Sequence, residues 1–388
     1  MARVRLRLAG LLCALALGAA ACGDGRAVDD GPRGRAAHVG ASSTKAVELR
    51  AGLTYLLVEE VDLVALAAVR AAGGPALAGA NRALADNAAE LSRILSDSPT
   101  TRALLQSATA RRHAALLAHA AGRGAHDRVA TAAAAAALDG QLMAFAHLAH
   151  ASADSVGLAE LTAELRGASS GQLAAVDAAV AHAPDAPTLV AAASARARRT
   201  AALLAAGLAA HLRLGATTGP AAELRAGLTA LLVDHVYGVA AVTGSGVGQR
   251  AAAAALDAGS VALTRLLAGG RPEAQAPLLA TWREHIDFFS RYAVAGQQRD
   301  RSAATAARRG LDGDRRSFGA SVHQAVPPLP AETVAAELIG HVATLLTALD
   351  ALAAGDPDAP LALRAAAGPM PGVAAVLAGG ITEDRQLP

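Results

Sequence analysis

Residues 223–229 read Glu-Leu-Arg-Ala-Gly-Leu-Thr, and the same seven residues stand 175 positions earlier, at 48–54. Two further matches follow in the same order, both displaced by 173 positions: Leu138-Asp139-Gly140 recurs as Leu311-Asp312-Gly313, and Pro184-Asp185-Ala186-Pro187 as Pro357-Asp358-Ala359-Pro360. Several matches that keep the same order and are separated by nearly the same number of residues are typical of an internal repeat. The sequence therefore predicts a tandem duplication, with repeats over residues 45–217 and 218–388.

Composition predicts that both repeats are helical. Of the 388 residues, 53% are hydrophobic but only 2% are aromatic, and about a quarter are alanine. Alanine, leucine, arginine and glutamate favour helices, whereas the β-branched and aromatic residues that strands prefer are scarce. We expect an all-α fold of two tandem, homologous up-and-down helical bundles, each with five to six helices.

Glycine and proline mark where these helices end in the second repeat. Pro327, Pro328 and Pro330 make a firm break, and Pro220 starts the first helix, where proline is tolerated. The expected helices cover residues 221–242, 249–268, 273–294, 298–322, 331–354 and 359–378.

The N-terminus has the pattern of a secretion signal. Three arginines in the first seven residues precede an apolar run over 8–17, which is too short to span a bilayer. Small residues then lead to Cys22, so the segment resembles a bacterial lipoprotein signal, although Ala19 stands where that signal prefers leucine. The alternative is an ordinary signal peptide with an incidental cysteine.

The lipoprotein resemblance implies that residues 1–21 are removed, that Cys22 is lipidated, and that residues 22–44 form a flexible tether. Cys13 lies in the removed part, so no intramolecular disulfide is expected. We expect an exported protein, anchored to the outer face of the cell membrane or within the cell envelope, with no other membrane-spanning segment. The formal charge of +2 falls to −1 without the three N-terminal arginines, so we expect no nucleic-acid partner.

Three helices of the second repeat each place one histidine on the apolar face. Steps of three and four residues define these faces. They are Leu224, Leu228, Leu231, His235 and Gly238; then Leu278, Trp282, His285, Phe289 and Tyr292; and then Val334, Leu338, His341, Leu345 and Ala348. If the helices are neighbours, the three imidazoles converge inside the bundle.

Converging neutral imidazoles suit copper, zinc or iron, or a haem-like ligand. We therefore expect a metal site at His235, His285 and His341, with Asp257 as a second-choice oxygen donor. Asp234 and Glu284 each precede a histidine, but adjacent helical residues do not share a face. The alternative is that each histidine is a core residue whose ring nitrogens bond a carbonyl group or buried water.

The first repeat has a different set of residues. Glu60 corresponds to His235, Ala168 to His341, and His113 is matched with His285. Its fourth helix carries a second candidate cluster on one face, which would suit copper: Met143, His147, His150 and Asp154. The alternative for this cluster is a mixed face partly in solvent.

Catalytic motifs are mostly missing from the sequence. Gly244-Ser245-Gly246 lacks the strand–turn–helix context of a hydrolase nucleophile, and no glycine-containing loop fits a Walker or dinucleotide-binding pattern. An enzyme of the usual classes is not expected. The sequence favours a cell-envelope protein that binds a transition metal or haem-like ligand. The alternative is a structural or partner-binding envelope protein with no ligand.

Four segments of the second repeat resemble a helical repeat of exported bacterial proteins that are largely uncharacterised: residues 232–237, 254–263, 282–289 and 341–345. Some of those proteins carry an amine-oxidase N-terminal-like module beside the repeat. The resemblance implies that His235, His285 and His341 match motif positions, but it implies no activity. No Asn-Tyr-Asp or Asn-Tyr-Glu cofactor motif is present, so amine oxidase chemistry is not expected.

Overall fold

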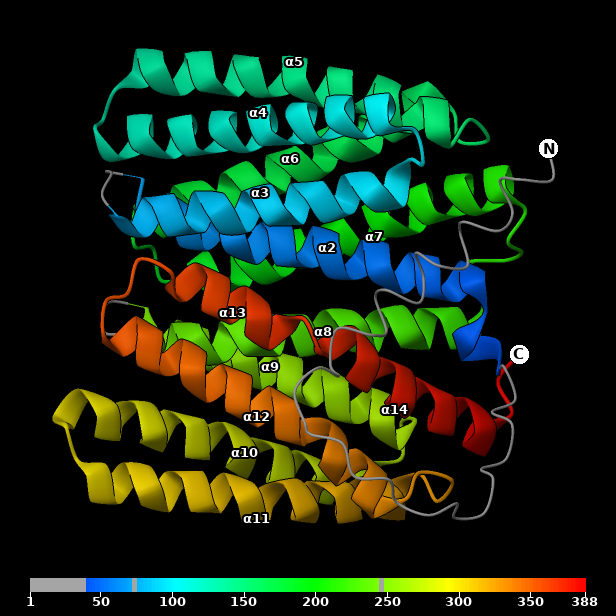
Figure 1. Cartoon of the computed structure of the whole chain (residues 1–388). Helices are drawn as coiled ribbons and strands as arrows, with labels where there is room; N and C mark the ends of the chain where they lie inside the picture. The colour runs from blue at the N-terminus through cyan, green and yellow to red at the C-terminus, as the bar shows by residue number, and fades with distance from the viewer. Residues whose placement is uncertain (1–39, 72–74, 244–247) are drawn as a thin grey trace, which may run out of the picture. The chain divides into compact units, whose positions relative to one another are not determined.

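The structure is a computed structural model that describes residues 40–71, 75–243 and 248–388; the expected signal peptide and Cys22 lie outside these ranges. Every regular element within them is a helix, which confirms the all-α prediction (Figure 1). The first half contains the short 3₁₀ helix η1 (Ala41–Ser43) and helices α2 (Lys45–Ala68), α3 (Pro75–Leu95), α4 (Pro99–Gly124), α5 (Arg128–Ser152), α6 (Leu158–Val180) and α7 (Ala186–Leu212). The second half contains α8 (Pro220–Thr243), α9 (Gln249–Ala268), α10 (Pro272–Gln298), α11 (Arg301–Ala325), α12 (Ala331–Ala353), α13 (Ala359–Ala367) and α14 (Met370–Arg385).

Several helix boundaries in the second half differ from the prediction; α10, for example, runs to Gln298 rather than to residue 294, and the last helix runs to Arg385 rather than to residue 378. Helix α11 begins later than expected, because the carboxylate of Asp300 accepts a hydrogen bond from the amide of Ala303 at 2.9 Å and so caps the helix there. The predicted helix over 359–378 is two helices, which are separated at Gly368 and Pro369. Proline has no amide hydrogen and its ring crowds the preceding turn, so it ends α13.

Turns of the same conformation recur between the helices, and they are separated by 173 residues, as two of the sequence matches are. Non-glycine residues adopt the left-handed conformation only at a cost, so these positions are informative. His126 (φ 55°) and Arg299 (φ 58°) are 173 positions apart, as are Arg213 (φ 56°) and Gln386 (φ 50°). The two halves therefore share the same turn conformations, as a duplication predicts.

Helices α2 and α8 lie at the centre of residues 41–388, which form one compact unit (Figure 1). They pack against each other and are buried on nearly all sides. Around them, α3 contacts α13 and α7 contacts α9. Because α9 corresponds to α3, and α13 with α14 to α7, exchanging the two halves reproduces these contacts. The halves are thus related by an approximate twofold axis.

Two buried arginines make equivalent contacts across this axis. The guanidinium of Arg50 donates to the carbonyl oxygen of Thr217 at 2.9 Å and to the carboxylate of Glu223 at 2.7 Å. Arg225, 175 positions later, donates to the carbonyl oxygen of Ser42 at 3.3 Å. Ser42 and Thr217 are also 175 positions apart. The first helix of each half therefore binds the segment that leads into the first helix of the other half.

Within the described residues, five segments are long and apolar enough to cross a membrane when judged by length and composition alone, although we expected no such segment beyond the N-terminus. They are α5, α8, α9, α12 and the range Ala359–Arg385. Alanine and leucine account for this property. In the structure, each of these helices turns a buried face toward neighbouring helices.

Close contact between the halves can be tested at Gly79 on α3. A methyl group at this position would overlap the backbone carbonyl of Pro357, just before α13. We predict that Gly79→Ala lowers the free energy of unfolding by about 1–3 kcal/mol, because the halves must separate to admit the methyl group. Chemical denaturation would measure the change.

Gly140 on α5 provides the matched control, since a methyl group added there meets nothing within 4 Å. Gly140→Ala should raise stability by about 0.5–1 kcal/mol, because alanine favours the helix more than glycine does. Equal effects at the two positions would contradict the described contact between α3 and the segment before α13.

Candidate metal centre

Three histidines from three different helices meet inside the second half. His235 on α8, His285 on α10 and His341 on α12 are 3%, 1% and 1% exposed. Their ring centroids are 5.7 Å apart for His235 and His285, 5.5 Å for His235 and His341, and 5.8 Å for His285 and His341. One nitrogen from each ring can be chosen so that all three lie within 4.8 Å of one another. The structure thus brings together the three residues singled out from the sequence.

Helix packing explains this convergence. Helices α8, α10 and α12 are mutual neighbours. On α10, the residues that share a face with His285 are all buried: Leu278, Trp282, Phe289 and Tyr292. A histidine within such a stripe is carried inward with its neighbours. We call His235, His285 and His341 the histidine triad.

A buried carboxylate orients one of the three rings. Nδ1 of His285 lies 2.8 Å from Oδ2 of Asp314 on α11, and both side chains are essentially inaccessible to solvent. With the Nδ1 proton donated to this carboxylate, the lone pair of Nε2 is free. Pairing a ligating histidine with a carboxylate in this way fixes the ring and raises its basicity.

The remaining ring nitrogens of the triad have no hydrogen-bond partner. They are Nε2 of His285 and both nitrogens of His235 and of His341. Leaving buried polar atoms unpaired costs about 1–3 kcal/mol each, and such atoms are few in native proteins. Five of them in one cluster indicate a site that is completed by something else.

Aromatic side chains form the walls around the triad. The ring centroid of Trp282 lies 4.6 Å from that of His235 and 5.2 Å from that of His285. Phe289 lies 4.9 Å from His285 and 5.9 Å from His341, and Phe318 packs 5.0 Å from Trp282. These rings exclude water and lower the local dielectric.

Burial favours the neutral form of His235 and His341. Desolvation, together with the smaller effect of the nearby His285, lowers the pKa of His341 to about 3. Desolvation also holds the pKa of His235 well below its usual value, and the other two histidines act in the same direction. Neutral imidazole is the form that binds metal ions, because its lone pair is free.

The acids considered from the sequence lie elsewhere. Asp257 forms a surface ion pair, its two oxygens 2.6 and 2.8 Å from the guanidinium of Arg283. Its expected role as an oxygen donor is therefore wrong. Glu284 is exposed. Asp234 is not among the residues that converge at the triad, and burial raises its pKa to about 7 although the charge of Arg198 opposes the shift.

Asp314 was missed in the sequence analysis, although a signal for it exists. On α11 the buried positions Ala307, Leu311, Asp314, Phe318 and Val322 follow steps of four and three. The periodicity that places the histidines on buried faces therefore also places this carboxylate on one. Asp314 is on a different helix from each triad histidine, so it is adjacent to none of them in the sequence.

The second cluster predicted on α5 does not form a site. Met143 is half-buried, whereas His147 is exposed and Asp154 lies beyond the end of the helix. Nδ1 of His150 bonds the carbonyl oxygen of Val156 at 2.9 Å. Its counterpart His323 bonds the carbonyl oxygen of Leu329 at 2.8 Å. His150 therefore fixes a turn, in the same way in both halves.

The first half fills the corresponding space with an ion pair. Helices α4 and α10 begin at Pro99 and Pro272, 173 positions apart, and this register pairs His285 with Arg112. The sequence match of His285 with His113 is thus wrong by one residue. Arg112 forms a buried ion pair with Glu60, the counterpart of His235.

Other groups complete this ion pair. Nε2 of Gln172 donates to Glu60 at 3.2 Å, and Nε2 of His113 lies 3.5 Å from the same carboxylate. Burial raises the pKa of Glu60, but the charge of Arg112 and the contact with His113 outweigh it and hold that pKa at about 2. The two charges of this pair therefore balance each other, although Nε of Arg112 and Nε2 of His113 have no hydrogen-bond partner.

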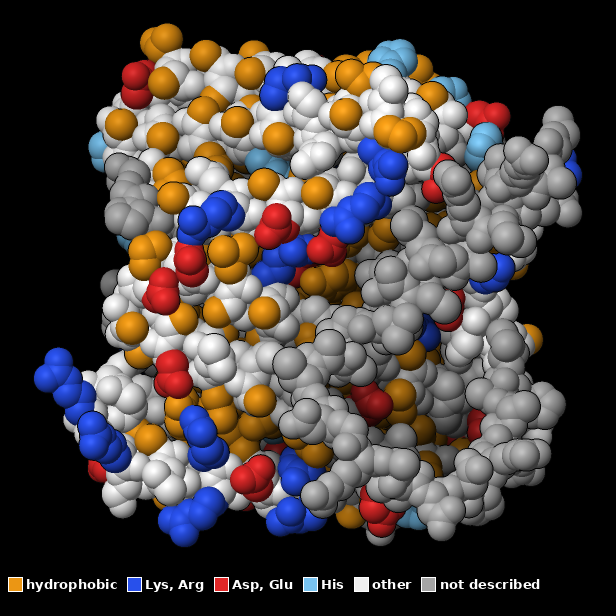
Figure 2. Space-filling model, in the orientation of Figure 1, with side chains coloured by type: hydrophobic (Ala, Val, Ile, Leu, Met, Phe, Trp, Pro, Cys, Tyr) orange, Lys and Arg blue, Asp and Glu red, His pale blue; other side chains and the backbone are white. Residues whose placement is uncertain are grey.

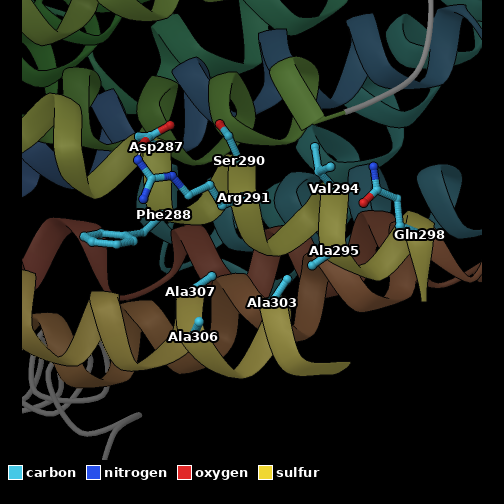
Figure 3. Close-up of a pocket in the computed structure, with 10 residues that line it drawn as sticks. All are labelled: Asp287, Phe288, Ser290, Arg291, Val294, Ala295, Gln298, Ala303, Ala306 and Ala307. Carbon is cyan, nitrogen blue, oxygen red and sulfur yellow. Dashed lines mark ion pairs between the residues drawn. The ribbon is translucent and has the colours of Figure 1, made fainter. Parts of the chain in front are cut away.

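A separate surface groove lies between α10 and α11 (Figure 3). Phe288, Arg291 and Val294 line one side of it, and Ala303 and Ala307 line the other. The guanidinium of Arg291 lies 5.4 Å from the centroid of the Phe288 ring. None of the triad residues lines this groove. On the face shown in Figure 2, basic side chains are interspersed with acidic ones.

The chain matches no protein-family model, no curated protein and no solved structure. The resemblance to exported helical-repeat proteins therefore stays a prediction.

The lowered pKa values of His235 and His341 predict how the stability of the metal-free protein depends on pH. Because the pKa values of His235 and His341 are lowered on folding, the unfolded state binds more protons between about pH 3 and pH 6.5. The free energy of unfolding should therefore fall as pH falls through this window. The limit is about 1.4 kcal/mol per pH unit for each histidine.

Denaturation in EDTA at pH 7 and pH 4.5 would measure this loss. The variant His235→Leu/His341→Leu removes both groups and should lose clearly less stability over the same interval. If the variant and the natural chain lost the same amount, the buried neutral state of these histidines would be disproved.

Proposed function

We propose that this protein is an exported, lipid-anchored binding protein that holds one transition-metal ion between α8, α10 and α12. His235, His285 and His341 are the ligands, and Asp314 orients His285. The observation that carries the proposal is the group of unpaired imidazole nitrogens, one from each ring within 4.8 Å of the others, in a buried site.

A single ion suits the spacing of the triad. Nitrogens that bind one ion at about 2.0–2.1 Å lie about 3.3–3.6 Å apart. The rings therefore need to close by about 1 Å, which small side-chain rotations supply. Ring centroids 5.5–5.8 Å apart, with Trp282 and Phe289 against them, favour an ion over a haem macrocycle, which would have to separate the rings.

The location rests on the N-terminal sequence. The basic start, the short apolar run and the small residues before Cys22 support export and acylation of that cysteine. A lipid on Cys22 would hold the helical body at the outer face of the cell membrane or within the cell envelope. The interspersed charges on the face in Figure 2 give no support to a nucleic-acid partner.

A structural role without a ligand is the second candidate, and the first half favours it. There the same scaffold position holds Glu60 and Arg112 as a buried ion pair that needs no ligand. A polar cluster can thus persist in this fold for structural reasons alone. The two candidates differ in whether the second half binds metal.

Metal analysis separates these candidates. The full chain, purified without a histidine tag, stripped with EDTA and dialysed against a zinc, cobalt or copper salt, should retain one ion per chain by mass spectrometry. His235→Ala/His285→Ala/His341→Ala should retain none, because all three ligands are gone. His147→Ala removes an exposed histidine outside the triad and should behave as the natural chain does.

Helix content by circular dichroism would show whether the triple variant folds. If it does not, His341→Ala alone serves as the test, since the loss of one of three ligands should still weaken binding. Less than a tenth of an equivalent in the natural chain with every one of the metals would contradict the proposal and leave the structural role.

Acylation has its own test. Intact mass of the membrane-bound protein should exceed the mass of the chain from Cys22 onward by that of a lipid, and Cys22→Ser should remove the difference and release the protein from the membrane. An unmodified Cys22 in the membrane fraction would contradict the anchor but not the metal site.

A further inference from the structure

We infer, on the basis of the proposed metal site, that the histidine triad selects monovalent copper, Cu(I), over divalent ions. Three features support this inference: the charge available near the site, the number of ligand atoms, and the aromatic walls.

The site contains one acidic side chain beside its ligands, which balances a single positive charge on a bound ion. Within the described residues, the ligand group around this point consists of three histidines and contains no carboxylate or thiolate. Metal ligation requires the imidazoles to be neutral. The carboxylate of Asp314, hydrogen-bonded to His285, supplies a single negative charge. Cu(I) with Asp314 is neutral overall, whereas a divalent ion leaves one uncompensated charge in a buried site, which is costly.

The number of ligands points the same way. Zinc takes four ligands in structural sites, and a catalytic zinc adds water to three protein ligands. Three nitrogens are sufficient for Cu(I), which forms stable three-coordinate complexes. Any divalent ion would need an added water or anion within a space bounded by Trp282 and Phe289. Hydroxide could supply the missing charge, but it would also have to fit there.

The aromatic walls favour a soft ion of low charge. The ring of Trp282 stacks on that of His285, with an interplanar angle of 27°. Such a wall removes water, which hydrates divalent ions more strongly than monovalent ones.

Asp314 acts in this inference as a positioning residue that also sets the charge of the site. Changing it to asparagine keeps the size of the side chain and removes the negative charge. The loss of this charge beside His285 should weaken Cu(I) binding by about 10–100-fold. It should weaken a divalent ion more, because the attraction lost doubles with the charge of the ion. The Cu(II)/Cu(I) reduction potential should therefore rise in Asp314→Asn.

The experiment compares Cu(I) and Zn(II) in the same metal-free full chain under anaerobic conditions at pH 7. Bicinchoninate competes for Cu(I), and a chromophoric zinc chelator competes for Zn(II). We expect one Cu(I) per chain, bound at least about 100-fold more tightly than Zn(II). X-ray absorption of the copper-loaded protein should show three nitrogen neighbours, and Asp314→Asn should raise the potential while it keeps the one-to-one stoichiometry.

The outcomes separate this inference from the proposal beneath it. If neither ion binds, the metal site itself fails. If Zn(II) binds as tightly as Cu(I), or if the potential is unchanged in Asp314→Asn, the site holds metal but does not select Cu(I). His147→Ala, carried through the same titrations, controls for binding by surface histidines.

Discussion

Burial of one stripe of side chains on each helix is the constraint on which the rest of this structure depends. The helices of an alanine-rich chain can approach closely, and each turns one face inward. A polar residue within that stripe is carried inside together with its apolar neighbours. His235, His285, His341 and Asp314 reach a common interior in this way, from four different helices.

The two halves show two ways of handling polar groups at one position of the fold. Glu60 and Arg112 neutralise each other, and Gln172 donates a further hydrogen bond to Glu60. In the second half only His285 has such a partner, and five nitrogens of the triad have none. The same fold therefore carries a charge-balanced ion pair in one half and a group of unpaired imidazole nitrogens in the other. This difference is the strongest support for a ligand in the second half.

Sequence periodicity was sufficient where a residue depended on its own helix, as it did for each triad histidine. It failed where contacts between helices decided the outcome. The carboxylate of Asp257 is a group that can bind a metal ion, but an ion pair with Arg283 on the next helix holds it at the surface. His150 sits beside other donors on α5, but it bonds the turn that follows. The match of His285 with His113 failed because a shift of one residue changes which helix face is compared.

The sequence by itself determined the helical class, the approximate ends of most helices and the inward face of each one, because propensity, capping and periodicity are local properties. It also determined the internal repeat, since a repeat is recognised from matching residues in the amino-acid sequence alone. Only the tertiary structure decided that α8, α10 and α12 are neighbours, that α11 adds a carboxylate, and that α2 and α8 lie together at the centre. These facts depend on which buried faces meet. The hydrophobic effect is not directional, so the apolar face of a helix does not specify which other helix it packs against.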